Sequence, residues 1–308
     1  MFQEGEVKYC PTTKEVFFKL YTHNYNVIRE KLPLLENLDP DAIHDIRVTS
    51  RRNRALLREF KNCIPPKVRK KCNNEMKNVT QLLGQRRELD VIRQLVISLK
   101  DKNPEIINDD FLTGFIAFLD KQRKEEEKNC RLAKNILDKW INLNIPANQC
   151  QTQFSSNFCI YLYGKKRIFS KIKKINNAFE IIKNKRKPLD ENIHQFRILL
   201  KKSRYMMEIY NNIYKEPTER WLSFLKKVQT QLGEWNDYRI LLVRVKEYEK
   251  VNINLKNDIN MEKIQNYINK LLVQKLDQSK KIVNEHLNFY FINKTKTEIK
   301  RLCSLHNC

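Results

Sequence analysis

Glycine and proline are scarce in this chain, which has five glycines and nine prolines in 308 residues. A β-rich protein needs many tight turns, so this scarcity excludes a turn-rich β architecture and favours long helices. Strand-like alternation with hairpin signals is also missing. The sequence therefore predicts an all-α protein.

Long hydrophobic runs are missing as well. The most apolar stretch, Phe111 to Leu119, is far shorter than the ~20 residues that span a bilayer. The start of the chain, Met1 to Glu6, is acidic and does not resemble a secretion signal. We expect a cytoplasmic protein without a membrane partner.

Paired cysteine motifs are absent, because none of the eight cysteines forms a CxxC pair. The default for such a chain is buried thiols, with no metal and no cofactor. Cys303 and Cys308 could in principle bind a metal or close a disulfide, but a frayed polar tail is the simpler interpretation.

Negative charge is in short supply. Sixty Lys and Arg stand against 36 Asp and Glu, which gives a net charge of +24. A chain this basic repels itself unless anions neutralise it, so its partner should be anionic. Nucleic acid, an acidic membrane surface, phosphate polymers and acidic proteins are the candidates.

Helical periodicity interrupted by proline runs through the whole chain. It predicts four helices in residues 9–145 and four more in residues 150–305, the last with a possible interruption. The expected helices are Lys14–Leu38, Pro40–Asn62, Pro66–Lys100, Asp110–Leu143, Phe154–Asn184, Asp190–Tyr214, Glu219–Lys250 and Met261–Cys303.

The two sets of helices contain matching sequence blocks. At an offset of 150 residues, Ile43–Val48 matches Ile193–Ile198, and the basic residues that follow match as well. Further on, Leu83–Glu88 matches Leu232–Asp237 at an offset of 149, with Gly84 and Gly233 expected to allow a kink or a close helix approach. A duplicated four-helix unit is the simplest account.

The first matching block carries a row of basic residues. On a helix, His44, Arg47, Arg51, Arg54 and Arg58 fall within a sector of about 80°, and His194, Arg197, Lys201 and Arg204 repeat the row, with Glu208 in the fifth place. Like charges one turn apart destabilise a helix, so two such rows indicate that an anion binds there. Arginine in particular can hold two phosphate oxygens at once.

These blocks resemble the CHAD domain, the conserved histidine α-helical domain. Its signature is similar to H-x-x-R-[VI]-x-x-[KR]-[RK]-x-R, which is met at His44–Arg54 and again at His194–Arg204. The downstream L-G-x-x-R-D signature is met only imperfectly, at Leu83–Glu88 and Leu232–Asp237. The resemblance covers nearly the whole chain and identifies residues 1–308 as one domain.

The resemblance implies two four-helix bundles related by a pseudo-twofold axis, with a basic central cavity between them. It also implies binding of inorganic polyphosphate, association with polyphosphate granules and no catalysis. Polyphosphate-metabolising enzymes would be possible partners, and sulfate or phosphate would also fit the site.

Eleven residues are the candidates for polyphosphate binding. The resemblance places His44, Arg47, Arg51 and Arg54 on the cavity wall opposite His194, Arg197, Lys201 and Arg204, whereas Arg52 and Lys202 are expected at its rim and Arg58 continues the first row. The full set is His44, Arg47, Arg51, Arg52, Arg54, Arg58, His194, Arg197, Lys201, Lys202 and Arg204.

Other interpretations remain open. Binding to the backbone of RNA or DNA is the main alternative, since net charge alone supports it; even a dedicated polyphosphate protein this basic should bind nucleic acid weakly. Glu4-Gly5-Glu6-Val7-Lys8 matches the E-x-E-x-K string of CYTH triphosphatases, but helices begin too soon for their β tunnel. The basic run Lys165–Lys174 is either a solvated face or an electrostatic path toward the cavity.

Overall fold

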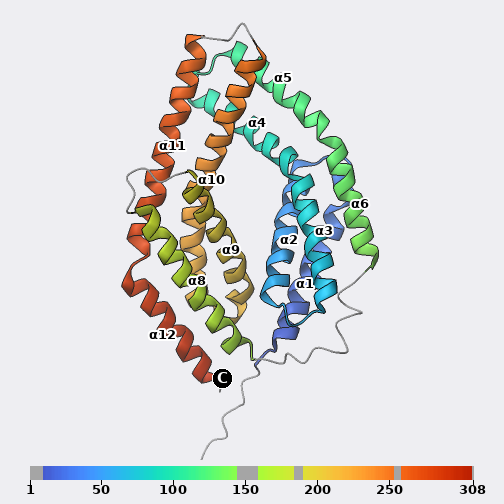
Figure 1. Cartoon of the computed structure of the whole chain (residues 1–308), viewed down its shortest axis with the longest axis vertical. Helices are drawn as coiled ribbons and strands as arrows, with labels where there is room; N and C mark the ends of the chain where they lie inside the picture. Colours follow the sequence, from blue (N-terminus) through green and yellow to red (C-terminus); the bar gives the residue numbers. More distant parts are fainter. Residues whose placement is uncertain (1–9, 144–158, 184–189, 253–257, 307–308) are drawn as a thin grey trace, which may run out of the picture.

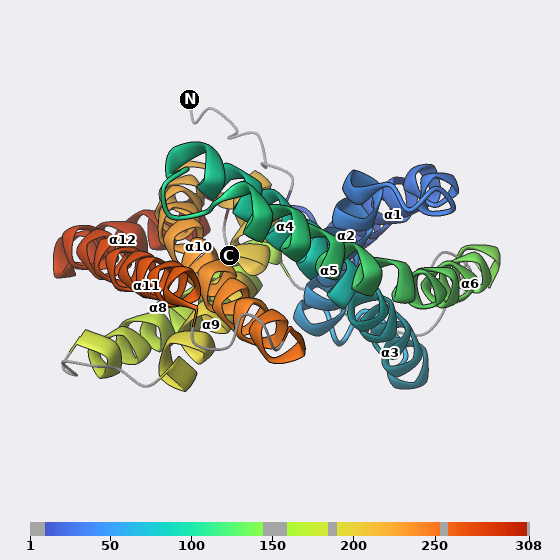
Figure 2. The ribbon, with the colours of Figure 1, turned by 90° about the horizontal axis from the view of Figure 1, so that it is seen from above.

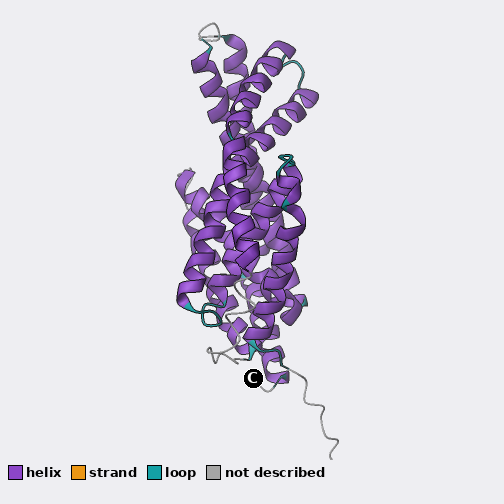
Figure 3. Ribbon diagram, turned by 90° about the vertical axis from the view of Figure 1, so that its right-hand side faces the viewer, coloured by secondary structure: helices purple, strands orange, loops and turns teal. Residues whose placement is uncertain are grey.

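The computed structural model describes residues 10–143, 159–183, 190–252 and 258–306. Nearly all of these residues are helical (Figure 3). Within these ranges, extended backbone pairs only in an isolated bridge between Thr12 and Cys159. The all-α prediction is confirmed.

The first half of the chain forms six α-helices and a short 3-10 turn within residues 10–143. They are α1 (Thr13–Lys31), η1 (Pro33–Leu35), α2 (Pro40–Glu59), α3 (Pro66–Leu82), α4 (Gly84–Lys102), α5 (Asp109–Glu125) and α6 (Glu127–Leu143). Local chemistry sets where helices begin: Asp39 accepts a hydrogen bond from the amide of Ala42 (2.7 Å), and Pro40 occupies the first position of α2.

The second half contributes longer helices, which the described residues from 159 onward resolve into five. They are α8 (Ile160–Lys183), α9 (Asp190–Tyr214), α10 (Glu216–Val251), α11 (Ile259–His286) and α12 (Phe289–Leu305). Figure 1 shows α10 rising through the centre of the molecule and α11 returning beside it.

Three of the predicted helices are each divided in two. The third breaks at Leu83 into α3 and α4, the fourth at Glu126 into α5 and α6, and the last between His286 and Phe289, where Asn288 caps α12 through the amide of Phe291 (2.8 Å). At the first break a Cβ on Gly84 would lie 3.1 Å from Nη1 of Arg47, so glycine permits this close approach.

Gly233 does not repeat that arrangement. It lies inside the continuous helix α10, and a Cβ there would meet nothing within 4 Å. The expected close approach is therefore wrong at this position, because the space beside Gly233 is open.

The hydrophobic core consists of two clusters, and each combines helices from both halves of the chain. The larger cluster includes Phe17 and Trp140 together with Ile172 and Trp221. The smaller one joins α4 and α5 to α10 and α11, at the narrow end of the molecule (Figures 1 and 2). Burial of shared apolar surface thus holds α4 across α10.

Direct contacts between α2 and α9 also join the two halves. Arg52 Nε lies 3.2 Å from a carboxylate oxygen of Glu208, and the hydroxyl of Tyr210 donates to Glu59 (3.3 Å). Just before α1 and α8 begin, the sulfur atoms of Cys10 and Cys159 lie 2.7 Å apart. The relative position of the two basic rows is therefore fixed by packing and by polar contacts.

Two further expectations concern metals and membranes. Among the described residues, no three His, Cys, Asp or Glu side chains are grouped to hold a metal ion, and Cys308 lies outside those residues. None of the helices described here is both long and apolar enough to cross a bilayer.

Candidate anion-binding site

The two basic rows lie on α2 and α9, each on the face opposite a buried apolar stripe. In α2, Ile43 and Ile46 are fully buried, which turns His44, Arg47 and Arg51 away from the core. In α9, Ile193, Phe196 and Leu200 are buried in the same way. The amphipathic pattern of each helix therefore decides which side chains are available to a ligand.

A cavity of about 520 Å³ lies where these rows meet α4 and α10. Its wall combines residues from all four helices, including Gly84 and Gly233. The charged and imidazole side chains on it are His44, Arg47, Arg51, Arg87, Glu88, His194, Arg197, Lys201, Asp237 and Arg239.

None of the six arginine and lysine side chains on the wall forms an ion pair within 4.0 Å in the described part of the chain, although such pairs occur on many other helices. The buried Nε atoms of Arg197 and Arg239 have no hydrogen-bond partner at all. Buried donors without partners cost free energy, so these two Nε atoms are available to the acceptor atoms of a ligand.

The two carboxylates on the wall, Glu88 and Asp237, are too few to neutralise its six arginine and lysine side chains. Glu88 is engaged by Arg244, whose Nη2 lies 3.0 Å from Oε1. Burial raises the pKa of Asp237, while the charges of Arg197 and Lys201 and a hydrogen bond from Asn236 oppose that rise. The wall keeps a clear excess of positive charge.

Burial and mutual repulsion lower the pKa values of two cations on the wall, Arg47 and Lys201. Burial, together with the charges of Arg51 and Arg87, lowers the pKa of Arg47 to about 10; its Nη1 donates to the carbonyl of Thr80 (2.8 Å). Burial, together with Arg197 and Arg51, lowers the pKa of Lys201 to about 7. The free cavity thus holds its positive charge at a cost, which an anionic ligand would remove.

The pKa of His44, the first residue of the α2 row, is lowered for the same reasons. Burial lowers the pKa of His44, and the charge of Arg87 lowers it further, as do Arg51 and Arg47, while Asp45 opposes them. Its imidazole is therefore mostly neutral at pH 7 in the free protein. It can accept a proton when an anion enters.

Six of the eleven predicted residues line the cavity, and five do not. His44, Arg47, Arg51, His194, Arg197 and Lys201 are on the wall. Arg54 and Arg204, which were also expected to line it, lie one turn further along their helices and are not among the residues on its wall. Arg52, Lys202 and Arg58 are exposed and outside the wall.

Two cations on the wall were missed by the sequence argument. Arg87 stands at the start of α4 and Arg239 in the middle of α10. Both belong to or directly follow the second repeated block, Leu83–Glu88 and Leu232–Asp237. That block was the available signal, and it marks the helices that close the cavity.

The basic residues of α8 lie in three different environments. Arg167 is structural, because its Nε lies 2.7 Å from the buried carboxylate of Glu59. Lys171 is half-buried next to cations of α2 and α9, whereas Lys173 is exposed. The string Glu4–Lys8 lies outside the described residues.

Comparison with known proteins finds a family match over most of the chain and solved structures with a similar fold. The family model of the CHAD domain matches residues 21–246. The fold is similar to the crystal structure of the CHAD domain from the plant Ricinus communis, with a TM-score of 0.63 and 16% identity, covering 94% of this chain and 92% of that one. It is also similar to PptA from Streptomyces chartreusis, with a TM-score of 0.57 and 13% identity, covering 96% of this chain and 99% of that one. No match was found among curated protein sequences.

Proposed function

The chain belongs to the CHAD-domain family, and from this premise we propose that it binds inorganic polyphosphate in the cavity between α2, α4, α9 and α10. One observation carries the proposal: six arginine and lysine side chains line this cavity, and none of them forms an ion pair with a carboxylate among the residues that the structure describes. A linear polyanion without bases matches such a wall, because it offers a charge on every unit and needs no stacking surface.

Binding would draw on two sources of free energy. The polyanion releases condensed counterions when lysine and arginine replace them, which makes the affinity fall steeply with salt. It also supplies acceptors to Arg197 and Arg239, whose buried Nε atoms lack partners. We expect the first contribution for any polyanion and the second only for one that fits the cavity.

We also propose an architecture that suits this function. The two rows at an offset of 150 residues support a duplicated four-helix unit, with two bundles related by a pseudo-twofold axis through the basic cavity. The protein would act by binding and without catalysis, in the cytoplasm and on polyphosphate granules, where polyphosphate-metabolising enzymes would be its partners.

Nucleic-acid binding is less well supported. A single-stranded nucleic acid usually stacks its bases on exposed aromatic side chains. Of the aromatic residues whose exposure the structure describes, only Tyr290 is exposed. Contacts with RNA or DNA should then be limited to weak, nonspecific attraction by the net charge.

A comparative titration tests the proposal. The affinity of the purified protein for long-chain polyphosphate, tRNA, duplex DNA, ATP and orthophosphate would be measured over a range of salt concentrations. The cavity variant is His44→Ala/Arg51→Ala/Arg197→Ala/Lys201→Ala, which leaves the Arg47–Thr80 hydrogen bond in place. Its control removes four lysines from α8 and α12: Lys173→Ala/Lys294→Ala/Lys296→Ala/Lys300→Ala.

The proposal predicts that polyphosphate binds more tightly than the nucleic acids, and that this preference is lost in the cavity variant and kept in the control. Both variants should retain the helical circular dichroism spectrum. Equal affinity for all polyanions, reduced to the same extent by both variants, would mean that the protein is only diffusely basic and would reject the proposal.

A further inference from the structure

The two rows of basic residues end differently below the cavity. In α9 the row ends in Glu208, whose carboxylate lies 3.3 Å from Arg204 Nε and 3.2 Å from Arg52 Nε. One carboxylate thus neutralises two arginines on that face of the α2–α9 contact. In α2 the position at the matching offset of 150 residues is Arg58, a cation.

Arg58 belongs to a group of cations on the other face of that contact. The charges of Arg58 and Arg51 both lower the pKa of Arg54, after the larger effect of burial. Burial is also the main cause that lowers the pKa of Lys171, and Arg58, Lys174 and Lys202 lower it further. These side chains are therefore neighbours drawn from α2, α8 and α9, and α9 packs against both α2 and α8.

Direct contacts confirm that α8 passes the end of α2 at this place. Nη2 of Arg167 donates to the carbonyl of Arg58 (3.3 Å), and its Nε holds the carboxylate of Glu59 (2.7 Å). Glu59 is buried and also accepts from Tyr210. Glu59 thus forms its ion pair with Arg167; its charge also favours the protonated forms of Arg58 and Lys171, but within the described residues it forms no ion pair with either of them.

The group is continuous with the cavity. Arg51 is on the cavity wall, Arg54 follows it by three residues and Arg58 by seven, so the guanidinium groups descend one helical turn at a time, roughly 5 Å per step. The buried Nε of Arg54 has no hydrogen-bond partner. An anionic chain that leaves the cavity would meet cations on this face and the Glu208 carboxylate on the other.

We infer that Arg54, Arg58, Lys171 and Lys202 form a second subsite, an exit track that takes the polyphosphate chain out of the cavity on one face of the molecule. The inference rests on the proposed function and adds a direction and a chain-length preference to it. Only a polyphosphate longer than the cavity reaches the track, so long chains bind more tightly than short ones. The Glu208 face provides no equivalent route.

The test compares the binding of two ligands to wild type and to two variants. The affinities for long-chain polyphosphate and for tripolyphosphate would be measured for wild type, for the track variant Arg58→Ala/Lys171→Ala/Lys202→Ala and for the control Lys173→Ala/Lys296→Ala/Lys300→Ala, which removes the same charge elsewhere. Because each lost phosphate contact reduces the salt slope by about 0.7–0.9, the track variant should lose about 2–3 from the slope for the long chain.

The loss of long-chain affinity at low salt should be about 10- to 100-fold for the track variant, by the same counterion argument, and several-fold larger than its loss for tripolyphosphate. At about 0.15 M salt the control should change little, because charges more than about 8 Å away are then screened. Glu208→Arg, which places a cation on the opposite face, should tighten long-chain binding. If the track and control variants weaken the two ligands equally, the exit track is rejected while polyphosphate binding stands. If wild type binds neither ligand, the proposed function itself is rejected.

Discussion

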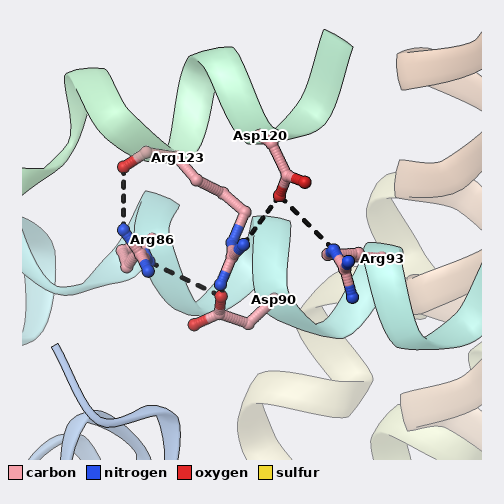
Figure 4. Close-up of polar contacts among 5 residues, drawn as sticks. All are labelled: Arg86, Asp90, Arg93, Asp120 and Arg123. Carbon is pink, nitrogen blue, oxygen red and sulfur yellow. Dashed lines mark hydrogen bonds and ion pairs between the residues drawn. The ribbon is translucent and has the colours of Figure 1, made fainter. Parts of the chain in front are cut away.

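Two groups of arginines on different sides of α4 show how this protein treats positive charge. Toward α5, Arg86, Arg93 and Arg123 share Asp90 and Asp120 (Figure 4). Arg123 lies 2.8 Å from Asp90 and 2.7 Å from Asp120, and Arg86 also donates to the carbonyl of Arg123 (2.9 Å). Every arginine of this group has a carboxylate partner.

The next residue along the helix, Arg87, lies on the cavity wall, where the arginine and lysine side chains form no ion pairs within the described part of the chain. Arg86 and Arg87 are adjacent in the sequence and identical in chemistry, but they leave α4 about 100° apart and so face different neighbours. The comparison teaches that the carboxylates around an arginine, more than the arginine itself, separate a structural charge from a ligand-binding one. Four predictions follow from it, beginning with the largest effect.

Asp90→Asn should disrupt the paired group. Asp90 is 3% exposed and lies between Arg86 and Arg123. Its loss leaves the buried Arg86 without a carboxylate partner and should reduce the free energy of unfolding by about 3–5 kcal/mol. Asp120→Asn is the matched control; because that carboxylate is 41% exposed, it should cost no more than about 1 kcal/mol. Urea denaturation measures both. Equal costs, or a loss of polyphosphate affinity in the folded Asp90→Asn protein, would contradict the separation.

Arg87→Ala/Arg239→Ala should weaken polyphosphate binding by about 100-fold, since a hydrogen bond to a charged group contributes about 1.5 kcal/mol or more. The unfolding free energy should not fall, because neither side chain has an ion pair to lose in the described structure. Isothermal titration and urea denaturation of the same preparation would check the two halves of this prediction. A variant that unfolds more easily and binds normally would assign both arginines to the structural group.

Lys201 should make binding depend on pH. Its pKa is about 7 in the free protein, and a bound polyanion favours the ammonium and raises that value. Above pH 7 the free protein must therefore take up a proton to bind, so the affinity should fall as pH rises from 7 to 9, by at most about tenfold per pH unit.

Lys201→Arg is the control for that titration, because arginine keeps its charge over this pH range. The variant should bind with little pH dependence above pH 7. If wild type and Lys201→Arg show the same dependence, Lys201 is not the titrating group.

Arg51→Gln should have the smallest effect on the free energy of unfolding, and it should raise that free energy where Asp90→Asn lowers it. Arg51 is a source of repulsion for His44, Arg47, Arg197 and Lys201, so its removal should stabilise the ligand-free protein by about 0.3–0.5 kcal/mol. Arg93→Gln, from the paired group, should instead be neutral or destabilising, because Arg93 lies 3.3 Å from Asp120. Thermal unfolding at low salt would resolve the two signs, and a destabilising Arg51→Gln would contradict the prediction.

The sequence predicted the helices and the two basic rows, because both depend on local periodicity. The division at Glu126 could not be predicted, since Glu125–Glu127 contains no chain breaker and the break depends on how α5 and α6 pack. Arg87 and Arg239 were missed because they meet the rows only across a cavity formed by four helices. Arg54 and Arg204 were placed on the wall because a helical wheel gives the face of a residue but not how far a cavity extends along it.

The central claim is that the cavity cations are held unpaired for a polyanion, and thermal unfolding with and without long-chain polyphosphate tests it most directly. The proteins to compare are wild type and Arg51→Gln/Arg197→Gln/Lys201→Gln. The account predicts that the ligand-free variant melts at a higher temperature than wild type, and that polyphosphate stabilises wild type, by about 2.7 kcal/mol at 100 times the Kd, but not the variant. A variant that melts lower than wild type and is still stabilised by polyphosphate would contradict the claim.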